Sequence, residues 1–337
     1  MNKNQIEQTK SLLEYPKKIV IIPHRNPDGD AMGSTLGLCH FLKQLNHDVL
    51  VIAPNDFPSN LAFLPGSENV LIYENNKEKN AKFLEEAELL FTLDFNALHR
   101  TGEMGQLLEK LSAPFIMIDH HEAPSDYAAV TYSDTSFGST CEMIYNFILF
   151  LDGKDKINLD VATCLYTGIT TDSGSYRFPK TTPTTHRVVA ELLEKGVKNY
   201  EVHNLLFDNN SYNSLQLLGR ALQNMKIIPE LKTSYITLSQ KELDEFNYVK
   251  GDTEGIVNYG LSLKGIIFTA IFIENKEENI IKISFRSQGD FDVNKFAREH
   301  FNGGGHINAA GGKSYENMNN TISKFIKIIN ATTQLEN

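Results

Sequence analysis

Short apolar runs alternate with longer amphipathic segments along the first half of the chain. Uniformly apolar runs of this length predict buried parallel strands, because helices cover both faces of a parallel sheet. We place strands near 17–23, 49–53, 89–93 and 114–118, with helices between them. This order predicts an α/β fold whose N-terminal part is a doubly wound, mostly parallel sheet.

The pattern changes in the second half, where Ile, Phe and Thr dominate the strand-like runs. Strands are expected over Met225–Pro229, Thr233–Leu238, Ile266–Glu274 and Ile280–Arg286, and helices near 252–262, 292–300 and 316–330. Helical periodicity over Ser214–Asn224 follows a polar segment, so we place the connection there. The sequence therefore predicts a domain at 1–208, a connecting helix or linker at 209–224, and a smaller α/β domain at 225–337.

Acidic residues and histidines directly follow several of the strands that are expected in the first half of the chain. The first strand runs into His24-Arg-Asn-Pro-Asp28-Gly-Asp30, the third into Asp94, and the fourth into Asp119-His120-His121. Because the carboxyl ends of parallel strands share one edge of the sheet, these side chains are expected to lie together. Asp172 follows a further apolar run, in a segment of small residues.

A single acid at a strand end is most often a turn residue or a helix cap. Asp30 alone is explained equally well as the cap of a helix over Ala31–Leu45. Three acidic strand ends, two of them with imidazoles, are hard to explain as caps. The sequence therefore predicts a metal site at this edge.

In this order the segments resemble the successive motifs of the DHH phosphoesterases. These are His24-x-x-x-Asp28-x-Asp30, Asp94, Asp119-His120-His121 and Asp172. Towards the C-terminus, three segments resemble the DHHA1 domain that accompanies them: Ser284-Phe-Arg286-Ser287, Asn302-Gly303-Gly304-Gly305-His306 and Ala309-Ala310-Gly311-Gly312. The resemblance covers almost the whole chain. Length and arrangement are most similar to the standalone group of nanoRNases and pAp phosphatases, which hydrolyse very short RNAs and 3'-phosphoadenosine 5'-phosphate (pAp).

The resemblance implies two divalent cations and a ligand set for each. His24, Asp28 and Asp94 match the ligands of one cation, and Asp30, Asp94, His120 and Asp172 match those of the other. Asp94 would bridge the two. Mixed imidazole and carboxylate ligands favour Mn²⁺, with Co²⁺ or Mg²⁺ as alternatives.

The resemblance also implies roles outside the ligand set. His121 is expected beside the substrate, where it can bind the phosphate or protonate the leaving oxygen, and Asp119 is expected to orient a ligand imidazole. The expected substrate-binding residues are Arg286, Ser287, Gly303, Gly304, Gly305 and His306. Arg100 is a weaker candidate because it lies six residues beyond Asp94, and a surface role explains it nearly as well. The three glycines are expected to form a loop of open N–H donors. The active site is expected in the cleft between the DHH domain and the DHHA1-like domain.

The charge and composition of the chain limit the kinds of molecule that it is expected to bind. The net charge is −10, and no Lys- or Arg-rich run supplies the many phosphate contacts that long duplex DNA needs. Short single-stranded RNA, pAp and dinucleotides need only a few phosphate contacts, so they are the expected partners. No apolar run approaches the roughly 20 residues of a membrane span, so we expect a cytoplasmic protein without membrane contact; a homodimer is compatible with the sequence.

Other functions stay open. A phosphodiesterase of cyclic or linear dinucleotides (c-di-AMP or pApA) would have the same metal motifs. A manganese pyrophosphatase would need a different C-terminal signature, and a processive single-strand exonuclease usually carries extra DNA-binding segments. A catalytically silent nucleotide-binding protein is disfavoured because every expected metal position is filled.

Overall fold

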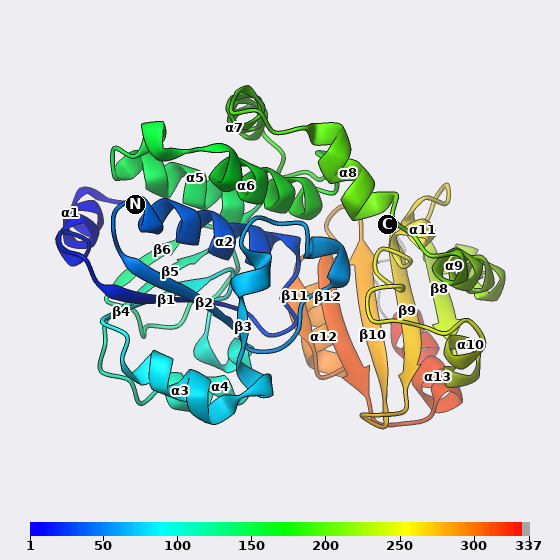
Figure 1. Cartoon of the computed structure of the whole chain (residues 1–337). Coiled ribbons are helices and arrows are strands. Elements are labelled where there is room, and N and C mark those ends of the chain that lie inside the picture. The colour runs from blue at the N-terminus through cyan, green and yellow to red at the C-terminus, as the bar shows by residue number, and fades with distance from the viewer. Residues whose placement is uncertain (332–337) are drawn as a thin grey trace. The chain divides into compact units, whose positions relative to one another are not determined.

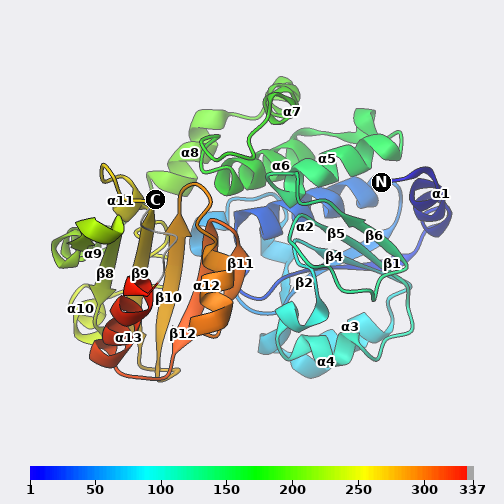
Figure 2. The same cartoon turned by 180° about the vertical axis from the view of Figure 1, so that it is seen from behind.

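The computed structural model describes residues 1–331, which divide into two compact units: Met1–Asn209, and a second unit that begins at Asn210. Figures 1 and 2 show the chain from opposite sides. Each unit has its own sheet and its own hydrophobic core. Among the described residues, no helix is long and apolar enough to cross a membrane.

The first unit is built on a six-stranded parallel sheet in the order β3-β2-β1-β4-β5-β6. Its strands are β1 (Lys18–Pro23), β2 (Asp48–Ala53), β3 (Leu71–Ile72), β4 (Leu89–Leu93), β5 (Phe115–Asp119) and β6 (Val130–Ser133). Its helices are α1 (Lys3–Leu12), α2 (Gly29–Lys43), α3 (Lys77–Glu85), α4 (Met104–Leu108), α5 (Thr140–Phe150), α6 (Leu159–Asp172), α7 (Pro183–Glu194) and α8 (Asn199–Phe207). Helices α2, α5 and α6 lie on one face of the sheet, and α3 and α4 lie on the other (Figure 1). The four predicted strands and the parallel doubly wound fold are confirmed.

The strand order reverses between β1 and β4, and such a switch point opens a crevice at the carboxyl ends of the strands. The register puts Pro23 beside Leu93, so the next residues, His24 and Asp94, emerge next to each other. On the other side of β4, Leu93 pairs with Ile118, and the Asp94 N–H donates to the Ile118 carbonyl at 3.1 Å. The sheet thus delivers the three predicted strand ends to one edge.

Helices α2 and α6 cross unusually closely because glycines line the crossing. A Cβ on Gly33 would lie 2.5 Å from the Cys164 carbonyl oxygen. A Cβ on Gly168 would lie 2.2 Å from Cys141 Sγ and 2.9 Å from Asp30 Oδ1. The close packing therefore sets the position of Asp30 at the start of α2. The three cysteines, Cys39, Cys141 and Cys164, are free and buried.

The second unit contains a six-stranded sheet in the order β11-β12-β10-β9-β8-β7, antiparallel except for the β8–β9 pair. Its strands are β7 (Lys226–Ile228), β8 (Thr233–Leu238), β9 (Phe268–Asn275), β10 (Ile280–Ser287), β11 (Gly304–His306) and β12 (Ala309–Ser314). Its helices are α9 (Tyr212–Asn224), α10 (Gln240–Glu245), α11 (Asn258–Leu261), α12 (Val293–His300) and α13 (Met318–Asn330). Helices α12 and α13 lie together on one face of this sheet (Figure 2).

Several local predictions differ from the structure. Helix α9, which was expected as part of the connection, packs Leu217 and Ala221 into a core with strand β8 and belongs to the second unit. The helix expected near 252–262 is only the short α11, preceded by turns. The glycine-rich segment is the hairpin of β11 and β12 instead of a loop. Strand β6 and helix α10 were not predicted.

The helix crossing leads to a stability prediction. The substitution Gly33→Ala should lower the free energy of unfolding of the first unit by about 1–3 kcal/mol, because the new methyl group collides with backbone. Gly219→Ala is the control, since a Cβ there meets nothing among the described residues within 4 Å apart from the neighbouring backbone of its own helix, and alanine favours the helix. Chemical denaturation followed by circular dichroism measures both. A Gly33→Ala protein as stable as the wild type would show that the crossing is not tight.

Candidate metal centre

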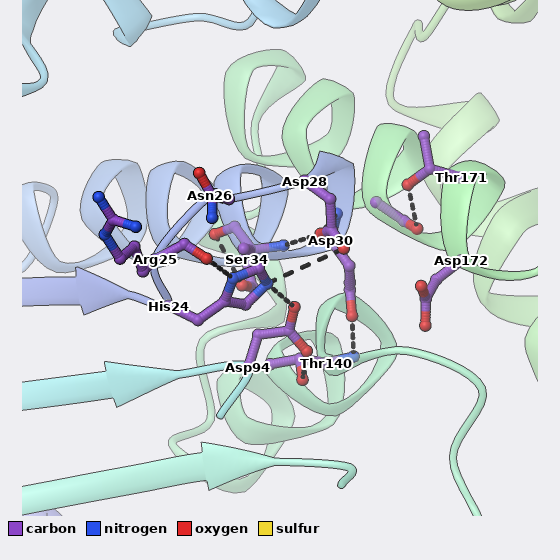
Figure 3. A network of polar contacts seen from close by, with 12 residues as sticks. His24, Arg25, Asn26, Asp28, Asp30, Ser34, Asp94, Thr140, Thr171 and Asp172 are labelled. Carbon is purple, nitrogen blue, oxygen red and sulfur yellow. Dashed lines mark hydrogen bonds and ion pairs between the residues drawn. The ribbon is translucent and has the colours of Figure 1, made fainter. Parts of the chain in front are cut away.

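Asp94 lies at the middle of the candidate centre, directly after β4. It is 2% exposed and its backbone has a left-handed φ of 65°. Its two carboxylate oxygens face two different imidazoles (Figure 3 shows the His24 side). Oδ2 lies 3.5 Å from His24 Nε2, and Oδ1 lies 3.4 Å from His120 Nε2. The carboxylate therefore has the placement of a bridge between two sites.

His24 belongs to the first cluster. Its Nδ1 lies 2.9 Å from the carbonyl oxygen of Arg25, which can only accept, so Nδ1 carries the hydrogen. That leaves Nε2 to face Asp94 and the Asp28 carboxylate, which lies 3.9 Å away. The other Asp28 oxygen accepts the N–H groups of Asp30 and Ala31, so Asp28 is the N-cap of α2. The cap that was considered for Asp30 is therefore made by Asp28.

His120 belongs to the second cluster. Its Nδ1 lies 3.3 Å from the Phe137 carbonyl oxygen, which again leaves Nε2 for the cluster. Nε2 lies 3.4 Å from Asp172 Oδ2 and 3.9 Å from Asp30 Oδ2. Asp172 is the last residue of α6, so a helix end supplies this ligand candidate.

The N-terminus of α5 holds two of the carboxylates. Asp30 accepts the Thr140 N–H at 2.6 Å and the Cys141 N–H at 2.8 Å. The Thr140 hydroxyl donates to Asp94 Oδ1 at 2.9 Å. Sequence reasoning missed Thr140, which directly follows Ser139, the N-cap of α5. Thr140 thus links one carboxylate of the second cluster to the shared Asp94.

The clusters perturb the pKa values of their members. Burial would lower the pKa of both imidazoles, but the hydrogen bonds and charges of the aspartates raise it to about 9 for His24 and about 10 for His120. Burial and the neighbouring Asp94 charge raise the pKa of Asp30 well above its usual range. Burial likewise raises the pKa of Asp172 to about 7. Protons thus compete for these side chains, and cation binding should strengthen as pH rises.

The donor sets fit divalent cations. One oxygen or nitrogen from each of His24, Asp28 and Asp94 lies within 4.8 Å of the others, and the same holds for Asp30, His120 and Asp172. Both imidazoles point their Nε2 inward, and each Nδ1 has a carbonyl partner that fixes the ring. The six residues expected as ligands are therefore brought together by the fold.

His121 lies beside the clusters. Its Nδ1 lies 2.7 Å from Asp119 Oδ1 and 3.8 Å from Asp94 Oδ1. Asp119 was expected to orient a ligand imidazole, but in the structure its partner is His121, while the Phe137 carbonyl lies beside the ligand candidate His120. Among the described residues, Asp119 Oδ2 has no hydrogen-bond partner although it is buried.

In the second unit, the pairing of strands β10 and β11 with β12 places Arg286 and His306 level with each other across the sheet. Both pair with Ala309, from opposite sides of β12. Opposed residues point to the same face of a sheet, so the two side chains flank one strand, roughly 10 Å apart. Arg286 Nη1 also donates to its neighbouring Phe285 carbonyl at 2.9 Å.

The other predicted substrate residues differ from expectation. The Gly303 N–H donates to the Ala297 carbonyl, and the Gly305 N–H donates to Asn294 Oδ1, so they form no open donor loop. A Cβ at Gly303 would lie 1.9 Å from the Gly311 carbonyl oxygen, which shows that glycine permits the tight hairpin.

The predicted substrate residue Ser287 is buried. Its hydroxyl donates to the Phe291 carbonyl at 2.6 Å and accepts from the Asn308 amide at 3.0 Å. In the first unit, Arg100 is exposed in a 3-10 helix (Leu98–Thr101), and its carbonyl accepts the Arg25 N–H at 2.9 Å. Ser287 therefore serves the fold in this structure, whereas the Arg100 side chain is accessible.

The chain is similar to known proteins over most of its length. Residues 18–169 match the family model described as DHH family, N-terminal domain, and residues 232–334 match the DHHA1 domain. The chain is 29% identical to the bifunctional oligoribonuclease and PAP phosphatase NrnA of Bacillus subtilis, over 93% of each chain. It is 32% identical to the protein of the same name from Thermus thermophilus, over 87% of this chain and 83% of that one.

Among solved structures, an exopolyphosphatase-related protein from Bacteroides fragilis superposes with a TM-score of 0.94. That protein is 38% identical, and the match covers 98% of this chain and 96% of the other. The fold of this chain is therefore shared over nearly the full length of a known structure.

The position of Asp94 leads to a prediction about cation binding. The wild-type chain should bind two Mn²⁺ ions, and Asp94→Asn should weaken both sites by at least tenfold, because one lost carboxylate serves both clusters. Asparagine tolerates the left-handed backbone at this position, so the fold should be preserved. Isothermal titration calorimetry measures both sites, and Asp126→Asn, at an exposed carboxylate, is the control. Loss of only one site in Asp94→Asn would contradict the shared ligand.

Proposed function

The chain belongs to the DHH family, and we propose that it hydrolyses the phosphoester bonds of short oligoribonucleotides and the 3'-phosphate of pAp with two divalent cations. The observation that carries the proposal is the Asp94 carboxylate, whose two oxygens face the imidazoles of two separate donor sets. Two cations that share a carboxylate are typical of phosphoester hydrolysis. The Bacillus and Thermus relatives, whose names include both activities, support the choice of substrates.

The first unit would hold the cations. His24, Asp28 and Asp94 would bind one, and Asp30, Asp94, His120 and Asp172 would bind the other. When bound, the cations supply a lowered pKa for the attacking water and positive charge for the phosphate and leaving oxygens. Two imidazoles among carboxylates favour Mn²⁺ over Mg²⁺, which prefers an oxygen shell that keeps several waters.

His121 would act on the substrate. The hydrogen bond between its Nδ1 and Asp119 fixes the ring, which would bind a phosphate oxygen or protonate the leaving oxygen. The side chain is 17% exposed, which suits a group that is held by the protein and still reaches a ligand. We assign Asp119 to positioning His121, because Asp119 is buried and its contact is with that ring.

The second unit would anchor the distal part of the substrate. Arg286 can bind a phosphate with two parallel hydrogen bonds, and His306 lies in the same row of the sheet. A single pair of such groups suits a substrate of a few nucleotides. The net charge of −10 and the lack of a basic run disfavour long strands.

The proposal predicts a preference for short substrates. In the presence of Mn²⁺, kcat/KM should be highest for pAp and RNAs of about two to five nucleotides, and at least tenfold lower for RNA of about twenty, since anchoring energy is gained only within a limited reach. A length series of single-stranded RNA, assayed beside pAp, pApA and c-di-AMP at fixed salt, measures this.

The Asp94→Asn protein controls for contaminating nucleases and should hydrolyse none of these substrates. An efficiency that stays level or rises with RNA length would contradict the proposal and indicate a processive exonuclease. Turnover of only c-di-AMP or pApA would also contradict the proposal and indicate a dinucleotide phosphodiesterase.

A further inference from the structure

One residue of the loop between β1 and α2 has an unusual backbone. The loop begins with His24 and ends with Asp28, and between them Asn26 has a φ of 56°. The left-handed region costs an L-residue roughly 1–2 kcal/mol, although asparagine tolerates it better than most. Contacts from elsewhere in the fold must therefore hold the loop in this shape.

The buried side chain of Asn55 makes such contacts. Asn55 follows β2 and is 7% exposed. Its Oδ1 accepts the Asn26 N–H at 2.7 Å, and its Nδ2 donates to Asn26 Oδ1 at 2.9 Å. The two hydrogen bonds run in opposite directions, so both ends of the buried amide are satisfied. This pairing fixes the orientation of the peptide group before Asn26.

The same peptide group also contacts His24. It consists of the Arg25 carbonyl and the Asn26 N–H, which lie in one rigid plane and point in opposite directions. The carbonyl accepts the hydrogen of His24 Nδ1 at 2.9 Å, and Nε2 of that ring lies 3.5 Å from Asp94 (Figure 3). A continuous path therefore runs from the Asn55 amide through one peptide plane to the imidazole.

We infer that Asn55 is a positioning residue for His24, which it holds through the peptide group between Arg25 and Asn26. The inference rests on the metal ligation in the proposed function. Asn55 fixes which nitrogen of His24 carries the hydrogen and where the other nitrogen points, so it serves the first cluster. The second cluster does not depend on it, since the Nδ1 partner of His120 is the distant Phe137 carbonyl.

The experiment compares Mn²⁺ binding by calorimetry without substrate. Asn55→Leu has the same branched arrangement of side-chain heavy atoms, although its methyl groups are larger, and it makes neither hydrogen bond, so one of two Mn²⁺ sites should weaken about 10- to 100-fold while the other is unchanged. Asn55→Asp should keep both sites, because a carboxylate accepts the Asn26 N–H and the Asn26 amide can rotate to donate. Should Asn55→Leu not fold, Asn55→Ser carries the same expectation, since its short side chain cannot reach both atoms.

Asn80→Leu is the matched control. Asn80 is also buried in the first unit, at 3% exposure, and its amide donates to the Ile72 carbonyl at 2.8 Å, away from the clusters. The control should lose stability and keep both Mn²⁺ sites. The inference is overturned if Asn55→Leu binds two ions as the wild type does, or if Asn80→Leu loses a site equally. A wild-type chain that binds fewer than two ions would overturn the metal part of the proposed function as well.

Discussion

The candidate centre depends on one buried carboxylate between two imidazoles. Water does not solvate Asp94, so its charge is stabilised by the hydrogen bonds from His120 and His24, which hold its pKa well below the usual range although burial opposes this. The same contacts raise the pKa values of both histidines. Each group therefore keeps its charge only because the others are in place. Without Asp94, burial would lower the pKa values of both imidazoles, so that they would lose their charge and not remain as unpaired buried charges.

The backbone of the sheet alone brings these groups close together. His24 and Asp94 follow a registered pair of neighbouring strands at the point where strand order reverses, and His120 follows the next strand. This part of the centre could be predicted from the sequence, because apolar runs that end in polar residues identify the edge of a parallel sheet. Asp172 was identified by the order of the motifs. It lies at the end of helix α6, so the pattern of apolar strands could not locate it.

The parts that could not be predicted involve residues brought together from distant segments. Thr140 reaches Asp94 across 46 positions, and Asn55 reaches Asn26 across 29. Nothing near either residue in the sequence indicates its partner. The glycine-rich segment was misinterpreted for another reason, since consecutive glycines permit both an open loop and a hairpin with close backbone contacts. The expected cleft between the domains stays a prediction.

The central claim is that Asp94 bridges two cations, and electron paramagnetic resonance of the Mn²⁺-loaded protein tests it most directly. Two Mn²⁺ ions that share a carboxylate and a water lie roughly 3.5–4 Å apart. The account predicts the multiline spectrum of an exchange-coupled pair once two ions are bound per chain. Six-line spectra of isolated ions at the same loading would contradict it.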